Sequence, residues 1–171
     1  MRILSIVLLV SLLGWISACA QSKEKRVAST GHKGAAKGFP AAGRVEKTAA
    51  EWKRILPPEQ YAVTRQGGTE RPGSSKLLAI KEKGVYQCAD CSLPLFASKT
   101  KFESGTGWPS FWAPVDKQNV VVAGDNSLGM TRDEVICARC DAHLGHVFDD
   151  GPQPTGLRYC MNGIALKFSK E

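Results

Sequence analysis

Long apolar runs are almost absent from this sequence of 171 residues. Residues 3–13 form the one sustained apolar stretch, and its length falls short of the ~20 residues that a stable transmembrane helix needs. The sequence also lacks any repeat with a period of 20–50 residues and any long helical stripe, which argues against repeat architectures. Apolar residues make up 43% of the chain, which is sufficient for the core of one compact domain.

Excess charge is missing from most of the chain, although the net charge is +7. Residues 20–50 hold seven Lys or Arg residues against two Glu, and Arg2 adds one more positive charge, so residues 51–171 carry only +1. The near-neutral part argues against nucleic-acid binding by a folded domain. The basic stretch is rich in Lys, Gly, Ala and Ser, which is typical of a solvated, flexible tether that anionic lipid head groups can attract.

The N-terminus has the layout of a secretory signal, because Arg2 precedes the apolar run and small residues follow it. Two cleavage interpretations remain. The stretch ISAC over 16–19 resembles a bacterial lipobox, which we favour, whereas Ala18-Cys19-Ala20 fits an ordinary signal peptidase site. Under the first, Cys19 becomes the lipidated start of an outer-membrane lipoprotein that faces the periplasm. Under the second, Cys19 is removed and the protein is soluble in the periplasm.

We therefore expect a signal peptide over residues 1–18, a tether over 19–47 and one domain over 48–171. The stretch TAAE over 48–51 has the form of a capping box and predicts a short helix that Pro57 ends. Pro58 can begin a second helix, which Gly67 would close. Short apolar runs that predict strands follow over residues 84–88, 120–123, 135–137, 146–148 and 157–168. The predicted fold class is α+β, mainly antiparallel β.

Four of the six cysteines form two C-x-x-C pairs, Cys88 with Cys91 and Cys137 with Cys140. Together they supply the tetrahedral set of four thiolates that Zn²⁺ prefers, and a site filled by four protein ligands is structural. The pairs are 45 residues apart, so one zinc ion would join distant parts of the domain. Two disulfides and redox-active C-x-x-C pairs are the alternatives.

The remaining cysteine of the domain, Cys160, lies in the stretch RYCMNG over 158–163 and has no matching partner. Alternation along a strand places it on one face with Arg158 and Asn162, and the apolar residues on the other. The apolar parity reverses after Asn162-Gly163, which predicts a bulge or tight turn there. A single cysteine is by default a buried hydrophobe, but this polar face indicates a reactive thiol, whose thiolate a guanidinium favours.

Histidine is scarce, since the chain has three and only His143 and His146 lie in the domain. Both fall within 20 residues of Cys160, which favours catalysis over a structural role, and Asp149 or Asp150 could orient an imidazole. Two indoles and a phenyl ring lie in the segment 105–112, which is too rich in Gly and Pro for a regular element. This segment either covers the core or forms an aromatic pocket for a small apolar group such as a thioether methyl.

Several segments together resemble the type B methionine sulfoxide reductases: GVY over 84–86, FESGTGWPSF over 102–111, HLGHVFDDGP over 143–152 and RYCMN over 158–162. The resemblance extends from about Glu51 to Phe168 and includes TERP over 69–72. It implies a two-sheet antiparallel β fold with structural zinc away from the active site. It also implies reduction of the R epimer of methionine sulfoxide, chiefly in proteins.

The resemblance implies a role for each matching residue. Cys160 would attack the sulfoxide sulfur, and His146 would supply the proton that lets the oxygen leave. Trp108 would pack on the ε-methyl group and help select the epimer, with Phe148 near it. The geometry of water and substrate would be fixed by His143, Asp150, Arg158 and Asn162.

One residue departs from the family pattern. Many members carry a resolving cysteine where this chain has Thr106, and no other thiol is spare. We therefore expect the sulfenic acid of Cys160 to be reduced by an external thiol, such as a thioredoxin-like protein of the cell envelope, in a monomeric repair enzyme. A lipid-anchored zinc-binding interaction module is the alternative from another class, and a nucleic-acid zinc ribbon fits the near-neutral domain poorly.

Overall fold

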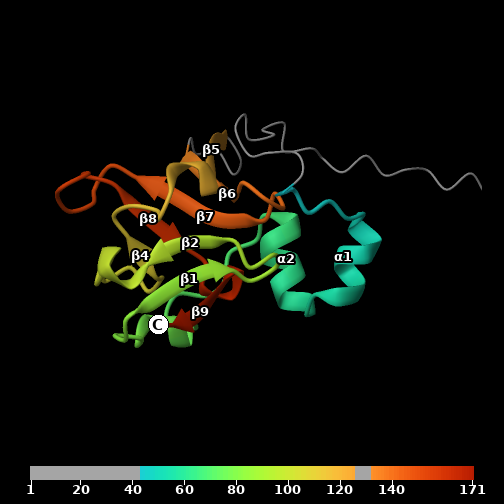
Figure 1. The fold of residues 1–171 in the computed structure, drawn as a ribbon, viewed down its shortest axis with the longest axis horizontal. Coiled ribbons are helices and arrows are strands. Elements are labelled where there is room, and N and C mark those ends of the chain that lie inside the picture. The colour runs from blue at the N-terminus through green and yellow to red at the C-terminus, as the bar shows by residue number, and fades with distance from the viewer. Residues whose placement is uncertain (1–42, 126–131) are drawn as a thin grey trace, which may run out of the picture.

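The computed structural model describes residues 43–125 and 132–171. The predicted signal peptide, Cys19 and most of the predicted tether lie outside these residues. Within them, no helix is both long enough and apolar enough to cross a membrane. Figure 1 shows two short helices at one end of a body built from β-strands.

Both predicted helices are present. α1 covers Ala49–Ile55, and the side chain of Thr48 accepts a hydrogen bond from the backbone of Glu51 while the Glu51 carboxylate accepts one from the backbone of Thr48. α2 covers Pro58–Gln66 and ends at Gly67, whose φ of 70° lies in the left-handed region. The capping box and the proline and glycine signals therefore gave the correct boundaries.

The strands form two antiparallel sheets, which confirms the predicted fold class. One sheet has three strands in the order β2-β1-β9, and the other has six in the order β3-β4-β8-β7-β6-β5. The bounds are β1 Gly84–Cys88, β2 Pro94–Ala97, β3 Lys101–Phe102, β4 Ser110–Phe111, β5 Val120–Asp125, β6 Arg132–Cys137, β7 His143–Phe148, β8 Arg158–Met161 and β9 Leu166–Lys170.

The predicted run over 157–168 is divided between the two sheets. β8 ends at Met161, a 3₁₀ turn covers Gly163–Ala165, and β9 then joins the smaller sheet. The break falls at Asn162-Gly163, as the reversal of apolar parity predicted. The expectation that segment 105–112 holds no regular element is wrong, because Ser110 and Phe111 form β4 between β3 and β8. Two paired residues leave no periodic pattern to detect.

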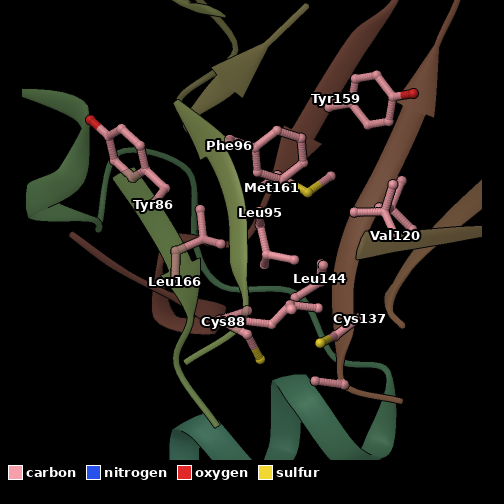
Figure 2. Close-up of a cluster of buried hydrophobic side chains, with 14 of the residues drawn as sticks. Tyr86, Cys88, Leu95, Phe96, Val120, Cys137, Leu144, Tyr159, Met161 and Leu166 are labelled. Atoms are coloured by element: carbon pink, nitrogen blue, oxygen red, sulfur yellow. The ribbon is translucent and has the colours of Figure 1, made fainter. Parts of the chain in front are cut away.

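The core fills the space between the sheets (Figure 2). Phe96 stacks on Phe111 with ring centroids 4.5 Å apart, and Tyr86 meets Phe111 edge to face at 4.9 Å. Tyr159 and Met161 of β8 are buried in this core. Since alternate side chains of a strand point to opposite faces, Cys160 lies on the outer face of the six-stranded sheet, turned away from the core.

The last residues of the predicted tether range contact the domain. Val45 packs against the core, and its backbone amide donates to the carbonyl of Arg139 at 2.8 Å. Arg44 forms an ion pair with Asp141 and donates to the carbonyl of Ala138 at 3.2 Å. The chain thus contacts the second C-x-x-C turn before it enters α1.

Candidate active site and metal centre

A row of four polar side chains crosses the outer face of the larger sheet. Ser110 of β4 is paired with Cys160 of β8, Cys160 with His146 of β7, and His146 with Glu134 of β6. Directly opposed residues of antiparallel strands share a face with their Cβ atoms about 4.5–5.5 Å apart. Register therefore places a thiol, an imidazole, a carboxylate and a hydroxyl side by side, although they come from four strands.

Gly145 makes the close pairing of β7 and β8 possible. Its φ is 154°, and a Cβ atom at this position would lie 2.1 Å from the carbonyl oxygen of Cys160. No side chain fits such a contact. The sequence His143-Leu144-Gly145-His146 thus places a glycine where the backbones of β7 and β8 come close together beside the thiol.

Hydroxyl groups border the thiol on the side of the 104–110 segment. Thr106 Oγ1 lies 3.8 Å from Cys160 Sγ and 2.9 Å from Ser104 Oγ, and Ser110 Oγ donates to Ser104 Oγ at 2.8 Å. Burial raises the pKa of Cys160, and the hydrogen bonds from Thr106 and Ser110 and the charge of Arg158 offset this only in part. The resting sulfur is therefore a protonated thiol at neutral pH.

Arg158, which was predicted to share the face of Cys160, is held from two sides. Asp150 binds it through two hydrogen bonds of 2.8 Å, and its guanidinium lies over the ring of Phe148 at 4.4 Å. The hydrogen bond to Asp150 is the main cause that raises the pKa of Arg158 and lowers that of Asp150. Asp150 thus orients the guanidinium, which keeps a fixed positive charge beside the thiol.

Asn162 and Trp108 meet at Glu70, a residue that sequence reasoning did not single out. Asn162 Oδ1 accepts from the backbone amide of Glu70 at 3.0 Å, and Trp108 Nε1 donates to its carbonyl at 3.2 Å. The Glu70 carboxylate accepts from the amides of Gly163 at 2.5 Å and Ile164 at 3.0 Å. Glu70 therefore fixes the indole relative to the end of β8.

Glu134 is the second residue that was missed. Its Oε1 lies 2.6 Å from His143 Nδ1, and both side chains are buried. The predicted strand began at residue 135, one position after Glu134. A predicted strand that included residue 134 would have placed an acidic residue on the strand that pairs with the histidine-bearing strand.

The four paired cysteines form the second site, where all four sulfurs lie within 4.8 Å of one another. Cys88 Sγ is 3.7 Å from Cys140 Sγ, and Cys91 Sγ is 3.6 Å from Cys137 Sγ. A tetrahedral zinc ion with Zn–S bonds of about 2.3 Å separates its sulfurs by about 3.8 Å, whereas disulfide sulfurs are about 2.05 Å apart. All four thiols are free. The residues fit a four-thiolate metal site.

Arg65 of α2 connects both cysteine turns to the helices. It forms an ion pair with Asp90, whose side chain is fully buried, and it donates to the carbonyl of Cys140 at 2.6 Å. Its guanidinium lies 3.7 Å from the ring centre of Trp52 on α1. Gln60 donates to the other carboxylate oxygen of Asp90 at 2.6 Å. Arg65 therefore joins both helices to the cluster of four cysteines.

The fold and the two sites are typical of an enzyme with a reactive thiol, because one half-buried cysteine lies beside histidine and arginine. Four other cysteines lie together at a separate site that could hold a metal ion. Residues 56–170 match the family model described as the SelR domain. The peptide methionine sulfoxide reductase MsrB of Methanosarcina mazei is 56% identical over 131 residues, which cover 77% of this chain and 94% of that protein. The MsrB of Pseudomonas syringae pv. syringae is 58% identical over 123 residues, which cover 72% and 94%. This chain belongs to the SelR-domain family, as a peptide methionine sulfoxide reductase of the MsrB type.

Proposed function

We propose that this chain reduces methionine-R-sulfoxide, free or within proteins, to methionine and so repairs proteins under oxidative stress. The observation that carries the proposal is the pairing of His146 with Cys160 on the outer face of the larger sheet. It places a proton carrier beside a nucleophilic sulfur. Membership in the MsrB family supports methionine sulfoxide as the substrate.

The proposed reaction uses the proton that the resting thiol carries. The sulfur of Cys160 attacks the sulfoxide sulfur, the sulfur–oxygen bond breaks, and the oxygen remains on Cys160 as sulfenic acid. Cys160–SH and R₂S=O thus become Cys160–S–OH and R₂S, so sulfoxide is reduced and the thiol oxidised. Sulfoxide oxygen leaves poorly unless protonated, and His146 carries the thiol proton to it.

Aromatic and polar groups around the thiol would place the substrate. Trp108 packs on the ε-methyl group and helps to select the R epimer, with Phe148 near it. Arg158 presents its charge beside the sulfur, and the two hydrogen bonds from Asp150 support that placement. Asn162 acts by holding the backbone of Glu70 to the end of β8. His143 contributes to the placement of substrate and water, and Glu134 Oε1 lies 2.6 Å from its Nδ1.

Regeneration would require an external thiol. Thr106 Oγ1 lies 3.8 Å from Cys160 Sγ, and a threonine cannot form a disulfide. A thiol of a thioredoxin-like protein attacks the sulfenic sulfur and releases water, which leaves a mixed disulfide. The partner's second thiol then releases Cys160–SH and keeps the disulfide.

The metal we assign is one structural Zn²⁺, bound by Cys88, Cys91, Cys137 and Cys140. When bound, it joins the ends of β1 and β6 and takes no part in the redox chemistry. The sulfur–sulfur distances of 3.6 and 3.7 Å support this assignment. Metal analysis of the purified protein tests it, with one zinc per chain as the expected result.

The proposed location is the periplasmic side of a bacterial envelope, where the protein would act as a monomer. The signal layout of residues 1–18 and the lipobox-like stretch before Cys19 support a lipoprotein. Mass spectrometry of the mature N-terminus distinguishes a lipidated Cys19 from a chain that begins after Ala20.

Stereospecific turnover tests the function. The purified protein is given the R and S forms of methyl p-tolyl sulfoxide and of dabsylated methionine sulfoxide, with dithiothreitol as the reductant. We expect turnover of the R forms alone, and its loss in Cys160→Ser. Equal turnover of both epimers, or activity that survives Cys160→Ser, would contradict the proposal.

A further inference from the structure

A bulge in β7 brings both domain histidines to the same face. His143 and His146 are three positions apart, so regular alternation would turn them to opposite faces. The register with β6 shifts, however, because Val135 is paired with Gly145 and the next residue, Ile136, with His143. Leu144 is the extra residue and is buried in the core. The rings of His143 and His146 consequently lie edge to face, 5.4 Å apart.

Glu134 fixes the ring of His143 from the neighbouring strand. The distance of 2.6 Å between Glu134 Oε1 and His143 Nδ1 is short enough for a charge-assisted hydrogen bond. The two residues expose 6% and 4% of their surface, respectively. An ionised carboxyl group has only acceptor oxygens, so beside such a group Nδ1 is the nitrogen that carries the proton. In a neutral ring, the hydrogen bond at Nδ1 thereby leaves Nε2 without a proton, as an acceptor.

The other nitrogen of His143 has no such partner. Within residues 43–125 and 132–171, Nε2 is buried and makes no hydrogen bond. β7 lies between β6 and β8, and β8 carries Cys160. Since Nδ1 contacts Glu134 on β6, Nε2 is the nitrogen that is left for another hydrogen-bond partner. A buried acceptor without a partner is unfavourable, and this one lies beside the row of polar residues that crosses the sheet.

We propose that Glu134 is a positioning residue that holds His143 in the tautomer protonated at Nδ1, so that Nε2 accepts a hydrogen bond from the oxygen that Cys160 removes from the sulfoxide. The proposal rests on the proposed function for the identity of that oxygen. The sulfenic acid presents an O–H group, and a bare Nε2 is the acceptor for it. Glu134 lies on β6, two strands from Cys160 on β8, and the proposal assigns it an effect on the tautomer of His143.

The first test needs no turnover. Nitrogen-15 NMR of the imidazole side chains in the wild-type protein reports which nitrogen of His143 is protonated. We expect the proton on Nδ1, and a proton found on Nε2 of the neutral ring would overturn the proposal. This measurement stands even if the chain reduces no sulfoxide, in which case only the proposed function fails.

The second test uses Glu134→Gln, which keeps the size of the side chain but can donate to Nδ1 through its amide. We expect a mixture of His143 tautomers and a kcat that falls on the order of 10- to 100-fold, as for other partners that orient a functional histidine, with KM changed less than about threefold. Asp133→Asn, at the adjacent exposed position, is the matched control and should change neither.

A double-mutant cycle shows whether Glu134 acts through His143. In a His143→Phe background, Glu134→Gln should have no further effect on kcat, because the ring that it orients is gone. An equal loss in both backgrounds would mean that Glu134 acts elsewhere and would overturn the proposal. So would a Glu134→Gln protein with unchanged kcat and an unchanged His143 tautomer.

Discussion

Opposing local effects determine the pKa of the Cys160 thiol. Its partial burial disfavours a negative charge, and this effect exceeds the stabilisation that Arg158, Thr106 and Ser110 give to a thiolate. A guanidinium two residues away therefore does not by itself make a reactive anion. In the proposed reaction, the sulfur is a thiol at rest, and its proton is available to the sulfoxide oxygen.

The pH dependence of alkylation measures this balance. We expect the midpoint for reaction of Cys160 with iodoacetamide to lie above the ordinary thiol value of about 8.5, because burial raises its pKa. Reactivity should therefore rise with pH through an alkaline midpoint. Arg158→Met removes a positive charge and should move the midpoint higher, while Lys167→Met, an exposed residue on the other sheet, should not. Mass spectrometry of the Cys160 peptide measures the extent of alkylation at each pH. A midpoint at or below about 8.5 would contradict the expectation.

Thr106 allows a direct test of the missing resolving cysteine. Since its Oγ1 is 3.8 Å from Cys160 Sγ, Thr106→Cys would put a second thiol within reach of the nucleophile. After one turnover without reductant, we expect an internal disulfide in this variant and a sulfenic acid that dimedone traps in the wild-type protein. Ser169→Cys, exposed on β9, is the control that should still give the dimedone adduct. Intact-mass spectra distinguish these products, and a wild-type disulfide to Cys160 would argue against external reduction.

The sequence pointed to Cys160 and His146 but not to the pair of Glu134 and His143. Alternation over residues 158–161 was confirmed, because a four-residue strand without a bulge obeys the period of two. Alternation fails on β7, where Leu144 is the extra residue that brings His143 to the face of His146. A bulge depends on the partner strand, so its position cannot be read from one segment.

The strands and helices differ in how well local patterns predicted them. The boundaries of α1 and α2 follow from Thr48, Pro58 and Gly67, whose effects are local. β4 was missed because two residues are too few to show an alternating pattern. The strand forms through its pairing with β3 on one side and β8 on the other. β2 begins at Pro94, a residue that favours turns in a sequence-based prediction.

The contact between β7 and β8 depends on one glycine. Gly145→Ala would place a methyl group 2.1 Å from the carbonyl oxygen of Cys160, and backbone on both sides must then move. We expect a loss of about 1–3 kcal/mol in the free energy of unfolding and a lower kcat, because His146 shifts relative to the thiol. Gly124→Ala on β5, where an added Cβ meets no atom within 4 Å, is the matched control. Urea denaturation and steady-state kinetics would show both effects, and equal stability of the two variants would contradict this view.

The cluster of four cysteines, which could hold a metal ion, lies where the two sheets and the helices meet. Cys88 ends β1 of the smaller sheet and Cys137 ends β6 of the larger one, and Figure 2 shows both at the end of the core nearest the helices. The matching C-x-x-C spacing revealed this connection in the sequence. The division of β8 and β9 between the sheets was less apparent, because residues 157–168 look like one strand until the chain turns.

Arg65 joins the helices to both cysteine turns. We therefore expect its replacement to destabilise the fold. Arg65→Met leaves the buried carboxylate of Asp90 without its ion pair, which costs about 3–5 kcal/mol when one partner of a buried pair is removed. It also removes the contacts with Cys140 and Trp52. We expect a lower Tm and a faster release of zinc to a chromogenic chelator, whereas Arg54→Met, at an exposed position of α1, should match the wild-type protein. If Arg65→Met lowered Tm but left the rate of zinc release unchanged, the arginine would hold the helices without protecting the metal. The helices and the two sheets would then not unfold as one unit.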